Sequence, residues 1–201
     1  KMKKTLSLLL SFVILLGILP VGSANIYAED NNGEYNGFTY IISDDKVTIT
    51  GGDKSTIAMT IPSEIEGYPV TAIGTGAFEY FYDLTSVEIP KSVTSIGYGA
   101  FYGCTALTDI TIPESVTIVD SMAFQYCTAL ETVTFSSGLT SIGEQAFMYD
   151  ENLKTIIIPR SLTEISDAAF YSCPNITTVY YSGSETDFGN ISIGSDNDYL
   201  T

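Results

Sequence analysis

The sequence contains no histidine and no tryptophan, and lysine and arginine account for only 8 of its 201 residues. Without histidine the chain cannot form a Ser/His/Asp or Cys/His catalytic arrangement, and it contains no GxSxG elbow or phosphate-binding P-loop. With 24 acidic residues and a net charge of −16, it lacks the basic clusters that bind nucleic acid or anionic membranes. We expect a non-catalytic protein without a cofactor, whose acidity favours solubility or attraction to a basic partner.

Cysteine is also scarce, with Cys104, Cys127 and Cys173 as its three occurrences. An odd number excludes a complete set of intramolecular disulfides, and the lack of histidine or a CxxC pair argues against a metal site such as zinc. The cysteines share one position of a repeating pattern, where Asp150 stands in the fourth repeat. We predict buried free thiols, with a Cys104–Cys127 bridge between neighbouring repeats as the alternative.

The N-terminal stretch has the composition of a secretory signal peptide. Three lysines surround Met2, an apolar run extends from Leu6 to Leu19, and small residues follow Pro20. Such a run is short for a membrane span but suits a signal peptide. We predict a signal peptide over residues 1–24, with cleavage after Ala24 or as late as Ala28, and therefore a secreted or cell-surface protein. An uncleaved membrane anchor is the alternative.

The chain is rich in internal repetition, with a period of 23 residues. Four apolar columns recur in phase over five copies, beginning at Ile73, Phe78, Leu84 and Val87. The phenylalanine column, in which an alanine precedes each ring, comprises Phe78, Phe101, Phe124, Phe147 and Phe170. A period of roughly 20 to 29 residues with an LxxVxI pattern is typical of a leucine-rich repeat solenoid.

Each repeat predicts two extended segments joined by turns. In LTSVEI, alternation turns Val87 and Ile89 inward and Ser86 and Glu88 outward. VTSIG gives a second extended piece, and AF..C is long enough only for a helical turn. We predict an α/β-type repeat, a right-handed leucine-rich repeat solenoid with a parallel β-sheet on one face and short helical turns on the other. The phenylalanines should stack as a structural spine with a spacing of ~4.8 Å.

The segments on either side of the repeats are expected to cover the ends of the stack. Residues 34–54 alternate as a β-hairpin that turns at Asp44-Asp45-Lys46 and forms an N-terminal cap, after a flexible leader over Asn31 to Asn36. The solenoid should occupy residues 55–181, with an insertion between Pro62 and Val70 forming an edge loop. Residues 182–201 should form a C-terminal capping segment that begins with a capping box at Ser184 and lacks an evident closing strand.

The repeat IPxSVTxIGxxAFxxCxxLxxVx resembles the BspA-like class of bacterial leucine-rich repeats. GFTYIISDDKVTITGG and YYSGSETDFGNISIGSDND resemble the segments that flank such arrays, so the resemblance covers residues 36–200. It implies a secreted or surface-displayed protein and a role in binding host matrix proteins or other cells. It implies no catalytic residues, because the family has no catalytic set.

Two surfaces are candidates for binding. Outward strand positions form the first, acidic at one end and apolar at the other: Glu88, Asp109, Thr111, Thr132, Thr134, Ile157 and Tyr180. The β-propensity of threonine and isoleucine is an alternative explanation for their presence there. The second is an aromatic edge beside the AF..C turn, comprising Tyr80, Tyr102, Tyr126, Tyr149 and Tyr171. These rings suit a recognition surface, or alternatively wall the turn against the phenylalanine spine.

We therefore predict a monomeric, secreted leucine-rich repeat protein that binds an extracellular protein or host-surface ligand, as adhesins do. The alternative is a structural spacer within a larger surface protein.

Overall fold

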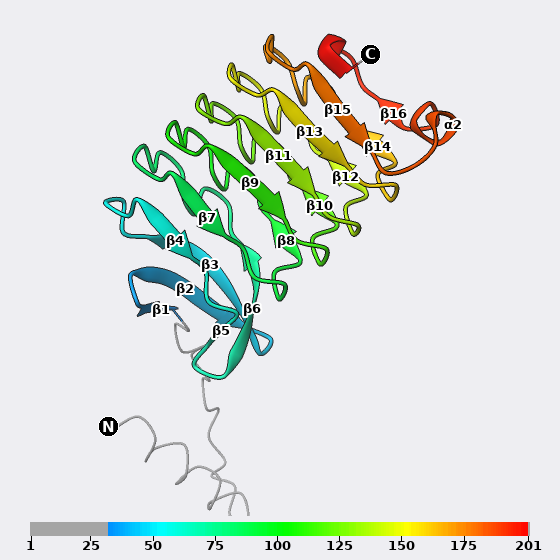
Figure 1. Ribbon diagram of the computed structural model, residues 1–201. Helices are drawn as coiled ribbons and strands as arrows, with labels where there is room; N and C mark the ends of the chain where they lie inside the picture. Colours follow the sequence, from blue (N-terminus) through cyan, green and yellow to red (C-terminus); the bar gives the residue numbers. More distant parts are fainter. Residues whose placement is uncertain (1–31, 201) are drawn as a thin grey trace, which may run out of the picture. The chain divides into compact units, whose positions relative to one another are not determined.

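The computed structural model describes residues 32–200, which form a stack of short parallel strands wound into a coil (Figure 1). The predicted signal peptide, residues 1–24, lies outside the described residues. None of the helices between residues 32 and 200 combines the length and the apolar character needed to cross a bilayer. The predicted fold class, a leucine-rich repeat solenoid, is confirmed.

Each repeat contributes one strand to each of two opposite faces. The LxxVxI segments form β4 (Ala58–Thr60), β7 (Ser86–Glu88), β9 (Asp109–Ile112), β11 (Thr132–Phe135), β13 (Thr155–Ile158) and β15 (Thr178–Tyr181). The second segments form β6 (Tyr68–Ile73), β8 (Ser95–Ile96), β10 (Ile118–Val119), β12 (Ser141–Ile142) and β14 (Glu164–Ile165). Neighbouring repeats pair in parallel at the 23-residue offset, as Val133 with Ile156 and Val119 with Ile142 show.

The five repeated phenylalanines stack between the two faces and are fully buried. Successive ring centroids along the stack lie 5.1 or 5.2 Å apart, and the last four rings are within 6° of parallel. This distance is close to the spacing of parallel strands, about 4.8 Å, because each ring follows its own strand. The stack is the structural core of the coil.

The AF..C segments do not form the predicted helical turns. Alternate N–H groups donate to the next repeat, as Phe78 to the carbonyl of Ala100 at 2.8 Å, while those between them close single turns, as Ala77 to the carbonyl of Gly74 at 3.2 Å. Each segment also holds two left-handed residues four positions apart, such as Gly76 and Tyr80 with φ of 60° and 61°. Such residues interrupt a right-handed helix. The segments are therefore successive tight turns along one edge, and the face opposite the LxxVxI strands is a second parallel sheet.

The three cysteines are buried free thiols, as predicted. Each thiol donates to a phenylalanine carbonyl of the preceding repeat, with Cys127 Sγ 3.3 Å from the oxygen of Phe101. Burial raises the pKa of Cys127 and of Cys173 well above that of an exposed thiol. Both side chains are therefore neutral packing groups.

Asp150 takes the cysteine position in the fourth repeat and is completely buried. Its Oδ1 accepts a hydrogen bond from the N–H of Cys127 at 2.8 Å, whereas Oδ2 has no hydrogen-bond partner. Burial raises the pKa of this carboxyl well above its ordinary value of 3.8. The fold therefore favours the neutral acid at this position.

Antiparallel strands precede the repeats. The predicted hairpin consists of β2 (Phe38–Ser43) and β3 (Lys46–Gly52), and β3 continues in parallel onto β6. The expected flexible leader is wrong over β1 (Asn32–Tyr35), which pairs with β2. Asn36 and Gly37 have φ of 48° and 84°, and this left-handed pair forms the tight turn that returns the chain. The hairpin contacts the spine, since the ring centroid of Phe38 lies 6.3 Å from that of Phe78, while its capping role stays a prediction.

The insertion between Pro62 and Val70 is a second small hairpin rather than a plain loop. Strand β5 (Glu64–Ile65) pairs with Tyr68 and Pro69 of β6 around Glu66 and Gly67, whose φ values are 54° and 87°. Ile65 is buried, so the insertion adds to the core.

The segment after the last repeat contains the predicted capping box. Ser184 caps helix α2 (Glu185–Phe188) by accepting from the N–H of Asp187 at 3.1 Å. The expected lack of a closing strand is wrong, because β16 (Ser192–Ile193) pairs in parallel with β14. Before the short 3₁₀ helix η1 (Asp198–Leu200), the buried Asn197 accepts from the N–H of Phe170 at 3.0 Å. These residues therefore repeat, in shortened form, the contacts of one further repeat.

Candidate functional site

The outward side chains of β7, β9, β11, β13 and β15 form one surface, which we call the strand face. It contains all seven residues predicted for binding: Glu88, Asp109, Thr111, Thr132, Thr134, Ile157 and Tyr180. Strand register aligns them across neighbours, with Asp109 beside Thr132 and Ile157 beside Tyr180. Their inward neighbours, such as Ile110 and Val133, are buried. The structure therefore brings the predicted residues together on one face, six of them on the sheet of β9 to β15 and Glu88 on the neighbouring strand β7.

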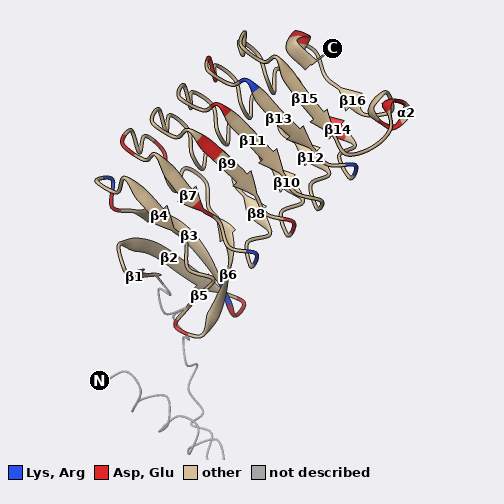
Figure 2. Cartoon of the chain, viewed as in Figure 1, with Lys and Arg blue, Asp and Glu red and all other residues tan. Residues whose placement is uncertain are grey.

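A groove of about 560 Å³ crosses the acidic end of the strand face. It lies where the sheet is interrupted, because β7 pairs only with β4, and β9 only with β11. Glu88, Asp109 and Thr111 all line it. Lys91 and Glu114, which also line the groove, form an ion pair at 3.1 Å between adjacent repeats. The pair compensates Glu114 and leaves Glu88 and Asp109 as the acidic groups, which Figure 2 shows in red on β7 and β9.

The opposite end of the strand face is aromatic. Tyr180 is 61% exposed, the same fraction as Ile57, and no other large apolar or aromatic side chain in residues 32–200 exceeds it. Ile157 beside it is half-buried. Exposed tyrosines next to aliphatic side chains are typical anchors at protein interfaces. The charged groove and this apolar end therefore offer two different kinds of contact.

The predicted aromatic edge is a continuous row of touching rings on the turn edge, which we call the tyrosine ladder. From Tyr80 through Tyr102, Tyr126 and Tyr149 to Tyr171, successive ring centroids lie 5.3, 5.6, 4.7 and 5.9 Å apart. Tyr80, Tyr126 and Tyr171 are 38–41% exposed. These rings do more than shield the phenylalanine spine from solvent, because a large part of each of these three tyrosine side chains faces outward. Tyr82, which the sequence analysis did not single out, joins the row 5.7 Å from Tyr80.

Three ladder tyrosines have a strained backbone. Tyr80, Tyr126 and Tyr149 have φ of 61°, 63° and 66°, and Gly103 holds the equivalent position of the second repeat with φ of 70°. A left-handed conformation costs roughly 1–2 kcal/mol for an ordinary L-residue, while glycine adopts it freely. The side chain of Tyr102 is a separate matter: its partial burial, together with the neighbouring Tyr80 and Tyr126, raises its pKa, so this phenol is neutral. Ser172, with φ of 56°, holds the equivalent position of the fifth repeat, so the left-handed conformation belongs to the turn and not to the rings.

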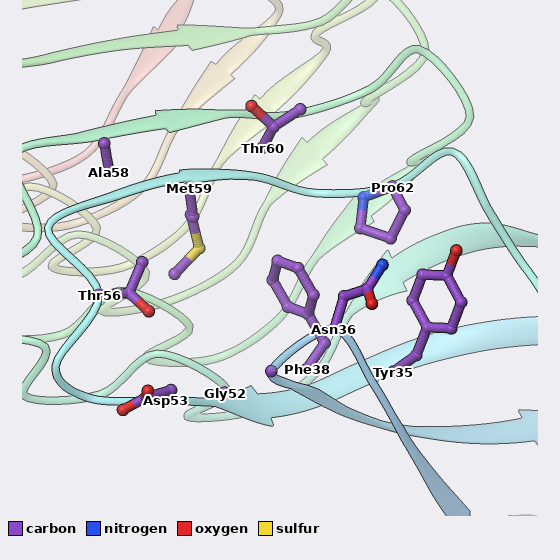
Figure 3. A pocket seen from close by; sticks show the side chains of 11 residues that line it. Tyr35, Asn36, Phe38, Gly52, Asp53, Thr56, Ala58, Met59, Thr60 and Pro62 are labelled. Carbon is purple, nitrogen blue, oxygen red and sulfur yellow. The ribbon is translucent and has the colours of Figure 1, made fainter.

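A smaller cavity of about 270 Å³ lies between the N-terminal strands and β4 (Figure 3). Met59 points from β4 toward Phe38, and Pro62 lies next to Asn36. Its acidic residue, Asp53, accepts from the N–H and the hydroxyl of Ser55 at 2.9 and 2.8 Å. These bonds lower the pKa of Asp53, so it is an ionised turn-forming group rather than a general acid.

Neither surface contains a recognisable catalytic arrangement or metal site. In residues 32–200, no cluster of three or more acidic or cysteine side chains has metal-binding geometry. The buried carboxyl of Asp150 and the buried thiols do not reach the surface. The groove and the cavity were not predicted, because they arise from a break in strand pairing and from the packing of the hairpin, which leave no pattern in a repeat sequence.

Comparison with known proteins places these surfaces in a family context. The family described as BspA type leucine rich repeat region matches residues 71–197 in six copies. A leucine-rich repeat protein of T. pallidum is 26% identical with a TM-score of 0.66, over 81% of this chain and 85% of its own. No curated protein matches the chain.

Two longer solved structures are also similar. A leucine rich cell surface protein of Faecalibacterium prausnitzii is 32% identical with a TM-score of 0.75, over 81% of this chain and 42% of its own. A leucine-rich repeat protein of Eubacterium ventriosum is 27% identical with a TM-score of 0.66, over 75% of this chain and 40% of its own. The chain therefore spans less than half the length of these two proteins.

Proposed function

Since the chain belongs to the BspA-type leucine-rich repeat family, we propose that it is a secreted or surface-displayed protein that binds an extracellular protein. Binding is adhesin-like and non-catalytic in this proposal. A similar protein is described as a cell surface protein, which supports the location. The strand face carries the proposal, because it gathers an acidic groove and an apolar anchor on one side of the solenoid.

The chemistry of the strand face suits a protein partner. No lysine or arginine occupies an outward position of β7, β9, β11, β13 or β15. Glu88 and Asp109 can meet a basic side chain at the groove. About 15 Å of sheet, estimated from three strand spacings of ~4.8 Å between β9 and β15, separates Asp109 from Tyr180. One partner surface can therefore contact both ends, with charge setting orientation and Tyr180 supplying apolar contact.

A spacer role is the second candidate function, and the length comparison favours it. The chain covers only 42% of the similar Faecalibacterium prausnitzii protein. A solenoid of this kind then separates other parts of a longer surface protein without binding a ligand itself.

A binding screen of residues 25–201 against host matrix proteins separates the two roles. Saturable binding is expected. The pair Ile157→Ala and Tyr180→Ala should weaken it by removing the apolar anchor, and the fold should be kept because both side chains point outward from the core. The pair Glu88→Gln and Asp109→Asn should weaken binding mainly at low salt, because exposed charges are screened at high ionic strength. The pair Asp44→Asn and Asp45→Asn, exposed in the turn between β2 and β3 and away from the strand face, is the matched control for the loss of two negative charges. Absence of binding to every matrix protein would favour the spacer.

A further inference from the structure

We propose that the tyrosine ladder is a second binding surface, separate from the strand face, that takes an extended lysine- and arginine-rich protein segment. The two surfaces occupy different parts of each repeat, since the ladder lies on the turns and the strand face on the LxxVxI strands. A ligand of the ladder therefore need not be the partner of the strand face.

The ladder is an accessible aromatic surface rather than a packing layer. Tyr80, Tyr126 and Tyr171 are 38–41% exposed, although the phenylalanines beneath are already fully buried. Ring surfaces are therefore available to a ligand along the turn edge.

The charge of the turns defines the ligand. The five turn segments, residues 74–84, 97–107, 120–130, 143–153 and 166–176, contain no lysine or arginine. They contain six exposed acidic residues: Glu79, Asp83, Asp120, Glu144, Glu151 and Asp167. Figure 2 shows acidic residues in the loops that lead into β7 and β13. Lys154, just after the fourth turn, is ion-paired with Glu131 at 3.1 Å. An acidic surface with aromatic rings attracts cations by charge and by cation–π contact.

The dimensions of the ladder fit an extended chain. Four repeat steps of ~4.8 Å give a ladder of roughly 19 Å, which about six residues of extended peptide span at ~3.3 Å each. Alternate side chains of such a peptide point the same way, so about three basic residues face the rings. Tyrosine also orders at little entropic cost, because it has only two rotatable side-chain bonds.

The left-handed backbone of the turn allows the rings to be removed without disturbing the fold. Tyr126 and Tyr149 sit at left-handed positions, where Gly103 shows that the turn forms equally with glycine. Replacing both by glycine removes the rings and relieves the backbone, so loss of binding can be separated from loss of fold.

The test is calorimetric titration of the chain with a 12-residue peptide of alternating lysine and serine. Glutamate–serine and glutamine–serine peptides are the charge controls, and Tyr180→Ala is the control variant on the strand face. Of the three peptides, the lysine peptide should be the one that binds, and its affinity should fall at high salt. The pair Tyr126→Gly and Tyr149→Gly should reduce its affinity about tenfold, since each exposed cation–π contact is worth roughly a factor of two to five. Circular dichroism melting should show that this variant remains folded.

Equal affinity of the double glycine variant would overturn the proposal. Equal binding of the glutamine peptide, or binding of a neutral cello-oligosaccharide in its place, would also overturn it, since either shows that cations are not selected. Loss of lysine-peptide binding in Tyr180→Ala alone would assign basic ligands to the strand face instead. Matrix-protein binding through the strand face is measured separately, so its failure leaves this result unaffected.

Discussion

Replacing Asp150 by asparagine should stabilise the protein at neutral pH. The carboxyl is completely buried, and only Oδ1 has a partner, the N–H of Cys127 at 2.8 Å. An amide keeps that acceptor and offers a donor in place of Oδ2, which has no partner. The cysteines at equivalent positions donate to phenylalanine carbonyls 26 residues earlier, so the asparagine amide should reach the carbonyl of Phe124.

The size of the effect follows from the linkage between proton binding by Asp150 and the free energy of unfolding. Burial raises the pKa of Asp150 in the folded state above 3.8. Below the unfolded-state pKa, the carboxyl is protonated in both the folded and the unfolded protein, so its ionisation does not change stability. As pH rises toward the folded pKa, the unfolded state loses its proton first, and stability falls by about 1.4 kcal/mol per pH unit. Above the unfolded pKa, the wild type should therefore lose about 1.4 kcal/mol of stability for each pH unit up to the folded pKa, and the asparagine variant should keep this stability.

The assay is urea unfolding of both proteins at several pH values. The asparagine variant should be the more stable protein at pH 6.5, and the difference in the free energy of unfolding should shrink toward pH 4. In a thermal melt, each 1.4 kcal/mol corresponds to a rise in Tm of roughly 3–6 °C for a domain of this size. Asp120→Asn, at an exposed position, is the control for removing one negative charge from an acidic protein. A lower stability of Asp150→Asn at pH 6.5, or a gap that does not change with pH, would refute the reasoning.

Two further predictions concern packing. Phe124→Ala should destabilise the protein by about 3–5 kcal/mol, because a fully buried ring in the middle of the stack leaves a cavity that its neighbours cannot close; urea unfolding measures the loss, and a change below 1 kcal/mol would contradict a rigid stack. Gly143→Ala should also destabilise, since an added Cβ would lie 2.5 Å from the backbone nitrogen of Ser121. Gly189→Ala is the control, with its nearest contact at 3.6 Å and φ of −64°, and thermal melting should show it unchanged. Equal melting temperatures for the two alanine variants would show that neighbouring repeats separate easily.

The 23-residue repeat by itself determined the solenoid, because a fixed period places each apolar column in the same environment of every coil. The phenylalanine stack, the buried cysteines and the seven residues of the strand face follow from that period together with strand alternation. The pairing of β2 with β3 also follows from local alternation and a polar turn.

The tertiary structure alone decided features that depend on contacts between repeats. The AF..C pattern predicted helical turns, but alternate N–H groups bond to the next repeat, and the sequence of one repeat does not reveal this competition. Strand β1 depends on the tight turn at Asn36 and Gly37, and the two-residue strand β16 exists only because β14 offers it an edge. The groove at Asp109 and the contact between tyrosine rings likewise reflect the spacing of neighbouring coils, which a one-dimensional pattern predicts only on average.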